Sequence, residues 1–152
     1  MSILRRRNEG GVAAVEFALV MLPLLYLVFG IIQYGLYFNA RESGTHATGD
    51  AVRRLSVGDC QTDTDLKAFI AARLGSASTT TQASLNTTVV YKKADGTAAS
   101  APGVVGGSVQ LQVRFDAVNM HFPFIPLPDD GSITSTVFGR VEDVSATPGG
   151  CS

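Results

Sequence analysis

The feature that most constrains this chain is a long stretch near its N-terminus that carries no charge. From Phe17 to Asn39 there is no Asp, Glu, Lys or Arg, and Glu16 stands immediately before the stretch. A helix needs about 20 apolar residues to cross the roughly 30 Å hydrocarbon core of a bilayer. The helix of a soluble core is rarely apolar over such a length. We therefore predict a membrane-spanning helix over residues 12–40.

The charges that flank this helix predict its orientation. Arg5, Arg6 and Arg7 precede the apolar stretch, whereas Arg41 and Glu42 after it are balanced. A cluster of arginines beside a membrane helix tends to remain in the cytoplasm. We therefore expect a single-pass protein with a cytoplasmic N-terminus, in which residues 41–152 form an outward-facing domain.

The apolar stretch differs from a secretory signal peptide in two respects. A signal peptide is cut after its apolar region at an A-x-A-like triplet, and no such triplet lies near the segment 41–43, so the helix should stay in the mature protein. The pair Gly10-Gly11 stands instead before the apolar stretch, where it lacks side chains and should disfavour helix. Glu16 is costly in lipid and therefore indicates a function, although a carboxylate that merely extends to the interface is the simpler alternative.

The residues around this pair resemble a known family. Gly11, the apolar segment 12–15, Glu16 and Phe17 resemble the class III signal of type IV pilins and pseudopilins, and residues 8–44 resemble the TadE-like minor pilins of the tight-adherence (Flp-type) pilus system. The resemblance implies that residues 1–11 are a leader, which a prepilin peptidase removes by cutting between Gly11 and Val12. It also implies that Glu16 pairs with the new amine of a neighbouring subunit, with Phe17 the first large residue beyond it.

The same resemblance implies a function in assembly. The processed subunit would lie in the bacterial inner membrane and enter a surface pilus used for adhesion or secretion. Its partners would be the prepilin peptidase, the major pilin, other minor pilins or assembly platform proteins, and membrane lipid. Two alternatives stay open: an unprocessed membrane accessory protein of an envelope assembly system, and an anchored binding module that holds a ligand in its outward domain. The N-terminal residue found in cells distinguishes the first alternative from the pilin.

The outward part of the chain reads as a small α+β domain. The first helix should continue to about residue 55, because small residues recur on one face at a spacing suited to packing on a sheet: Ala40, Gly44, Ala47, Ala51 and Leu55. A second helix is expected over residues 63–74, capped by Asp63 or Thr64 and followed by Gly75.

Three strands are expected after this second helix. Apolar and polar residues alternate over 85–91, 109–115 and 133–141, as they do in half-buried strands. Residues 98–107 read as a flexible connection, and the proline-rich residues 121–130 as an extended loop. The predicted fold is α+β and pilin-like: a long N-terminal transmembrane helix packed on a small antiparallel sheet.

The two cysteines predict one disulfide. Cys60 follows the long helix and Cys151 lies in the C-terminal tail, and an oxidising compartment outside the cytoplasm favours their pairing. The bond would close a loop of about 90 residues, which the chain-entropy model equates with roughly 4–5 kcal/mol. The alternative is two free thiols.

The composition excludes several other classes of function. His46 and His121 are the only histidines, and neither has a ligand-spaced partner, so we expect no metal site and no cofactor. No nucleophile elbow, phosphate-binding loop or CxxC motif is present, and we expect no enzyme. Without residues 1–11 the chain keeps 9 basic and 12 acidic residues, a net charge of −3, which gives no support for a nucleic-acid partner.

Overall fold

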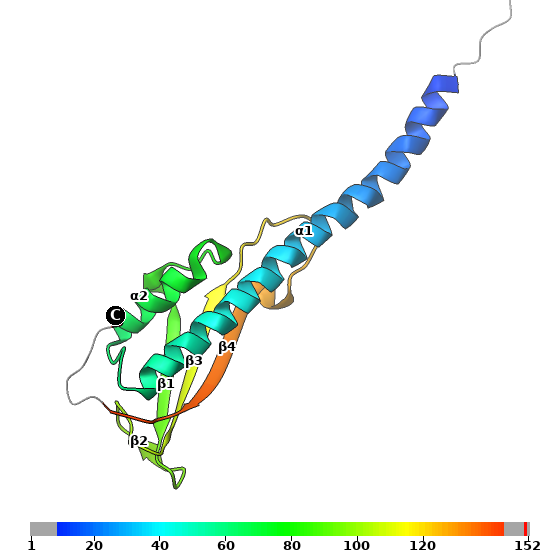
Figure 1. Cartoon of the computed structure of the whole chain (residues 1–152). Coiled ribbons are helices and arrows are strands. Elements are labelled where there is room, and N and C mark those ends of the chain that lie inside the picture. The colour runs from blue at the N-terminus through cyan, green and yellow to red at the C-terminus, as the bar shows by residue number, and fades with distance from the viewer. Residues whose placement is uncertain (1–8, 145–150, 152) are drawn as a thin grey trace, which may run out of the picture.

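A computed structural model describes residues 9–144 and residue 151 of the chain. One helix dominates it: α1 runs without interruption from Glu9 to Ser56 and continues through Pro23. Its N-terminal half projects away from the rest of the molecule, and its C-terminal half lies along a sheet (Figure 1). Within the described residues, α1 is the helix that is long and apolar enough to span a membrane.

The start of α1 differs from the expectation for Gly10-Gly11. Both glycines lie in the helix, which begins at Glu9. Glycine in a helix costs about 1 kcal/mol relative to alanine, and the apolar residues that follow are sufficient to extend the helix over the pair. The predicted end of α1 is confirmed, since the helix ends at Ser56. Just beyond it, Gly58 adopts a positive φ of 81°.

The domain consists of one sheet and one further full helix. After α1 the elements are α2 (Asp63–Leu74), the 3₁₀ turns η1 (Gly75–Ala77) and η2 (Gln82–Ser84), β1 (Asn86–Lys92), β2 (Ala98–Ala99), β3 (Ser108–Asp116), η3 (Pro128–Gly131) and β4 (Ser132–Arg140). The strand order is β2-β1-β3-β4, and every neighbouring pair is antiparallel. The predicted α+β arrangement is confirmed.

The sheet has four strands rather than the three predicted. The additional strand, β2, has two residues, Ala98 and Ala99. They pair with Lys92 and Tyr91 of β1, respectively. It lies in the segment 98–107, which was expected to be a flexible connection. Two alanines give no alternating pattern, so the sequence offered no signal for this strand.

The central strand β3 provides the core of the sheet. Its residues alternate between buried and exposed, and the buried set is Val109, Leu111, Val113 and Phe115. Leu111 lies opposite Val89 of β1 and Val137 of β4. One face of the sheet is therefore apolar, and this is the face that α1 covers.

The small-residue face of α1 packs on that sheet, as predicted. Ala40, Ala47, Ala51 and Leu55 are all buried. Gly44 has no space for a side chain, because a Cβ atom there would lie 2.0 Å from Cζ of Phe115. The spacing of small residues thus lets the helix backbone approach the sheet closely.

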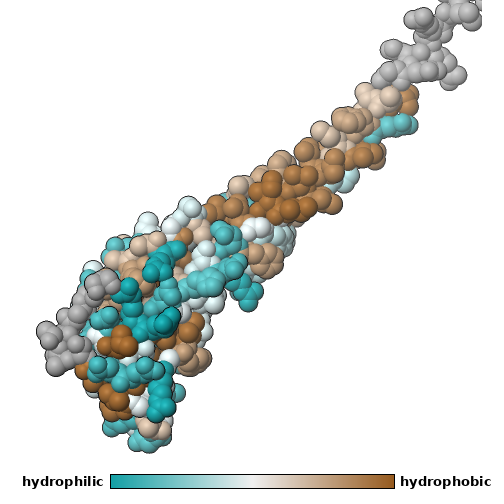
Figure 2. Space-filling model, viewed as in Figure 1, coloured by the Kyte–Doolittle hydropathy of each residue, from teal (hydrophilic) through white to brown (hydrophobic). Residues whose placement is uncertain are grey.

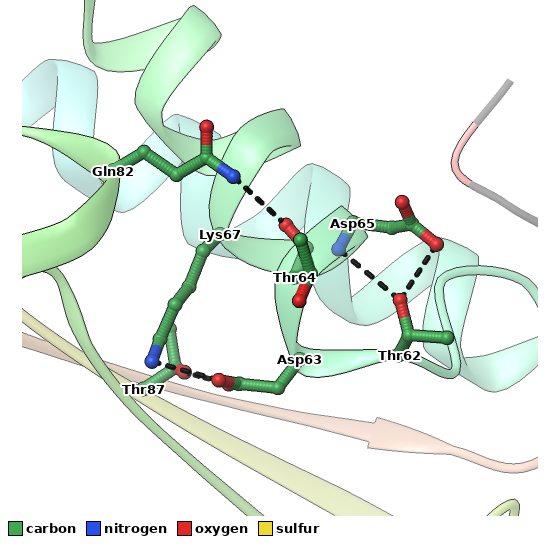
Figure 3. Close-up of polar contacts among 7 residues, drawn as sticks. All are labelled: Thr62, Asp63, Thr64, Asp65, Lys67, Gln82 and Thr87. Atoms are coloured by element: carbon green, nitrogen blue, oxygen red, sulfur yellow. Dashed lines mark hydrogen bonds and ion pairs between the residues drawn. The ribbon is translucent and has the colours of Figure 1, made fainter.

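The N-terminus of α2 is capped by Thr62, one residue earlier than the predicted Asp63 or Thr64. The Thr62 hydroxyl accepts a hydrogen bond from the backbone N–H of Asp65 (3.2 Å), and Thr62 has an extended backbone. Asp63 acts differently: its carboxylate accepts a hydrogen bond from Thr87 (2.7 Å) and lies 2.7 Å from Nζ of Lys67 (Figure 3). The Lys67 contact, followed by the Thr87 hydrogen bond, lowers the pKa of Asp63.

Candidate functional site: the projecting half of α1 and its junction with the domain

The projecting half of α1, residues 11–28, meets the rest of the described chain mainly near its C-terminal end, around Leu22, Leu25 and Tyr26. Every residue in this range is exposed, including large side chains such as Leu19 (71%) and Phe17 (66%). Figure 2 shows a mainly hydrophobic surface over this half, interrupted by a hydrophilic patch near its tip, and a mixture of hydrophilic and hydrophobic patches over the domain. An apolar surface of this extent marks contact with lipid or with other proteins.

The predicted leader and assembly residues lie together at the tip of this half. Gly11, Val12, Glu16 and Phe17 are all exposed and helical. A Cβ atom built on Gly11 would meet nothing within 4 Å. Residues 1–8, which include the arginines of the predicted leader, lie outside the described residues.

Glu16 is a carboxylate without a partner in the described part of the chain. No hydrogen bond or ion pair reaches it from residues 9–144 or from residue 151. Val12 lies one helical turn before Glu16, on the same face of α1, because side chains at i and i+4 lie above one another. The geometry therefore presents an acidic side chain on an apolar helix surface that is open to another molecule.

The junction between α1 and the domain depends on a residue that the sequence analysis missed. Gln33 is fully buried; its Nε2 donates to the carbonyl of Val118 (3.0 Å), and its Oε1 accepts from the N–H of Met120 (3.0 Å). The neighbouring Tyr34 hydroxyl donates to the carbonyl of Pro126 (2.9 Å). A glutamine inside an otherwise apolar run was the available signal, since a polar side chain there needs partners.

The segment that Gln33 holds, residues 118–127, is named here the aromatic loop. It packs against α1 through rings: Phe122 stacks on Phe29 with centroids 4.7 Å apart, and Phe124 meets Tyr26 edge-on at 6.2 Å. A cavity of about 210 Å³ with a mainly apolar lining lies between the loop and α1. The domain thus extends along α1 as far as Tyr26, within the range 12–40 that was assigned to the membrane.

The two cysteines form a disulfide at the other end of the domain. Cys60 is buried, its Cα lies 4.6 Å from that of Cys151, and the bond spans a sequence separation of 91 residues. Cys60 has a positive φ of 58° in the turn that follows α1. The bond ties residue 151 to the C-terminal end of α1, far from Glu16.

The described part of the domain has cavities besides the one beside the aromatic loop, but no cluster of metal ligands. In residues 9–144 and 151, no three His, Cys, Asp or Glu side chains come together as a metal ligand set. His46 is exposed and lies 3.7 Å from Glu42 on its own helix. A cavity of about 430 Å³ lies between α2 and β1, but Asp63, the charged side chain on its described lining, is already held by Lys67 and Thr87.

These features define a class: a protein with one long apolar helix, half of it free and half of it docked on a small α+β domain. In a comparison with known protein families, residues 11–53 match the family model described as TadE-like protein. The match confirms the resemblance on the helix and ends before the sheet begins. No curated protein and no solved structure significantly matches the chain. Over residues 11–53 the chain is therefore similar to TadE-like proteins.

Proposed function

We propose that this chain is a minor pilin or pseudopilin of a tight-adherence pilus system, cut between Gly11 and Val12 and assembled through Glu16. The observation that carries the proposal is the position of Glu16. It is the fifth residue counted from Val12, it lies within the family-matched segment, and it has no partner among the described residues.

The physical reason for assembly is the cost of an unpaired carboxylate in an apolar environment. A buried charge is unfavourable alone and acceptable when it is paired. Cutting after Gly11 would create a positive amine at Val12, four residues before Glu16. If that amine pairs with Glu16 of a neighbouring subunit, the two helices are offset along their axes by roughly 6 Å, since an α-helix rises 1.5 Å per residue.

The first test concerns cutting. Replacing Gly11 with Leu should block the peptidase, so that the N-terminal mass includes residues 1–11 and the subunit is retained in the membrane. Gly30→Leu is the matched control, because a Cβ at Gly30 also meets nothing within 4 Å, and it should be cut normally. A Gly11→Leu protein that starts at Val12 contradicts the proposed cleavage. An unmodified protein that keeps its leader beside an active prepilin peptidase identifies the unprocessed accessory protein instead.

The second test concerns assembly. Glu16→Gln should be cut normally, since the residue lies beyond the scissile bond, but most of its incorporation into sheared filaments should be lost. Glu42→Gln is the matched control; Glu42 is exposed on the same helix within the domain, and its removal should leave incorporation unchanged. Normal incorporation of the Glu16→Gln protein contradicts the role of Glu16.

The proposed orientation has a cytoplasmic leader and an outward domain, as the arginine cluster favours. The Cys60–Cys151 disulfide supports this arrangement, because such bonds persist in oxidising compartments. A reporter that is active only outside the cytoplasm, fused after Ser152, should be active. Activity of a reporter that works only in the cytoplasm contradicts the orientation.

A further inference from the structure

The aromatic loop, residues 118–127, accompanies α1 into its apolar half. Hydrogen bonds from Gln33 and Tyr34 and ring contacts from Tyr26 and Phe29 hold it there. In Figure 1 the loop is the yellow-to-orange segment beside α1 at the end of the domain nearest the projecting half. The loop contains no Asp, Glu, Lys or Arg, so its composition continues the apolar character of α1.

The outer side of the loop is uncovered and mainly apolar, with His121 as an exposed polar side chain. The Phe124 side chain is 89% exposed and makes only an edge contact with the Tyr26 ring, and Met120 is 47% exposed. Phe124 also has a positive φ of 67°, which is strained for a bulky residue. Such strain persists where the surroundings of the residue compensate for it. The described chain buries little of the Phe124 ring and therefore provides little of this compensation.

The position of the loop along α1 fits the boundary of a bilayer. Residues 12–29 extend over about 27 Å at 1.5 Å per residue, close to the roughly 30 Å hydrocarbon core. Irregular backbone exposed to lipid does not occur inside the core, whereas aromatic side chains concentrate at the interface with water. The core should therefore end near Tyr26 and Phe29, which lie 14 and 11 residues before the predicted limit at Ala40.

We propose that the aromatic loop is a second membrane contact, lying at the headgroup boundary on the domain's side of the bilayer with Phe124 directed to the acyl chains. The loop and α1 together fix the depth of the helix and the distance of the sheet from the surface. This inference depends on the membrane-spanning role of α1, which is part of the proposed function, and not on pilus assembly.

The absence of tryptophan from the chain permits a direct test. The Phe124→Trp variant of the full chain is reconstituted in vesicles of phosphatidylcholine and phosphatidylglycerol. The acyl chains of these lipids carry bromine, which quenches tryptophan fluorescence, either near the carbonyl or near the chain end. The variant should lose most of its fluorescence to bromine near the carbonyl and less to bromine at the chain end. Phe138→Trp is the matched control: Phe138 is 69% exposed near the distal end of β4, and neither lipid should quench its replacement.

A third variant separates the failure of this inference from the failure of the membrane assignment. Val20→Trp, at a 64% exposed position near the middle of the proposed span, should be quenched most strongly by bromine at the chain end. Quenching of Val20→Trp without quenching of Phe124→Trp overturns the loop contact and leaves the span intact. Absence of quenching in both variants overturns the loop contact and the membrane-spanning role together. Emission of Phe124→Trp that shifts with protein concentration, without quenching, places the ring against a second copy of the chain and also overturns the inference.

Discussion

In the projecting half of α1, residues 11–28, every residue is exposed, whereas in the docked half, residues 33–55, the face toward the sheet is buried. The projecting half presents Leu, Val and Phe in all directions, as a helix surrounded by lipid does. The docked half presents alanine and glycine to the sheet and places its charged residues elsewhere. One continuous helix thus follows two packing rules: large side chains where the domain does not cover it, and small ones where the sheet must come close.

The change between the two rules occurs at Gln33, the first fully buried residue of α1 counted from residue 11. Its side chain bonds to the backbone of the aromatic loop rather than to the sheet. A polar anchor suits this position, because apolar contact alone does not distinguish a protein loop from lipid. If the two halves follow separate rules, a substitution in the domain should leave the projecting half unchanged.

Removal of the disulfide should have the largest effect and should be confined to the domain. Cys60→Ala combined with Cys151→Ala opens a loop with a sequence separation of 91 residues, and the chain-entropy model predicts a loss of about 4–5 kcal/mol from the free energy of unfolding. Denaturant titration in detergent micelles measures it, and reduction of the unmodified protein should reproduce it. Hydrogen exchange of residues 12–28 should stay unchanged; faster exchange there contradicts the separation of the two halves.

Gln33→Leu should release the aromatic loop from α1. The carbonyl of Val118 and the N–H of Met120 lose their partners, and an unsatisfied buried polar group costs about 1–3 kcal/mol. Hydrogen exchange should accelerate in the aromatic loop and remain slow in β3. Gln112→Leu, at an exposed position on β3, is the matched control and should leave the loop protected. Unchanged exchange in the Gln33→Leu loop refutes the role assigned to this residue.

Gly44→Ala should destabilise the domain although alanine favours helix. The new Cβ would lie 2.0 Å from the buried Phe115 ring, and overpacking of this kind costs about 1–3 kcal/mol, offset by about 1 kcal/mol of helix propensity. Gly49→Ala, where a Cβ meets nothing within 4 Å, should instead raise the melting temperature. If both variants change the melting temperature in the same direction, close approach of α1 to the sheet is not what selects glycine at position 44.

Asp63→Asn should have the smallest effect, and that effect should depend on pH. Lys67 and then Thr87 lower the pKa of Asp63 in the folded chain, so its contribution is fully present above the ordinary aspartate pKa of about 3.9. It is lost as the pH falls through the lowered folded value. The carboxylate is largely exposed, and solvent screening limits the contribution to less than about 1 kcal/mol. The difference in stability between Asp63→Asn and the unmodified protein should shrink below pH 4; a constant difference contradicts the ion pair. Asp129→Asn, at an exposed position with a positive φ that asparagine tolerates, is the control.

The sequence was sufficient for features that depend on local periodicity. The apolar length of α1, its small-residue face and the alternation in β1, β3 and β4 are all direct consequences of spacing, and the structure has them. The cap of α2 was displaced by one residue, because Thr62, Asp63 and Thr64 are all good caps and only the geometry selects among them. The strand β2 was missed because its partner in β1 determines it, not its own two alanines.

The proposed cleavage and assembly residues form a motif within one segment, whereas the junction between α1 and the domain joins two segments. Gly11, Val12, Glu16 and Phe17 lie within a single stretch, so a motif can be recognised there. The contacts of Gln33 with Val118 and Met120 join residues more than 80 positions apart, and nothing near Gln33 indicates which loop it would meet. The extension of the aromatic loop along α1 could not be predicted for the same reason, because it depends on contacts between residues far apart in the sequence.

The disulfide also determines how the protein carries mechanical load. Tension applied between the tip of α1 and Cys151 passes along the helix to Cys60 and then through one covalent bond, whose ends are 91 residues apart in sequence. The sheet, with α2 and the aromatic loop, lies in the bridged segment and outside this line of force. A subunit pulled between the tip of α1 and Cys151 therefore loads the backbone of α1 and a sulfur–sulfur bond, while the hydrogen bonds between its strands bear almost none of the tension.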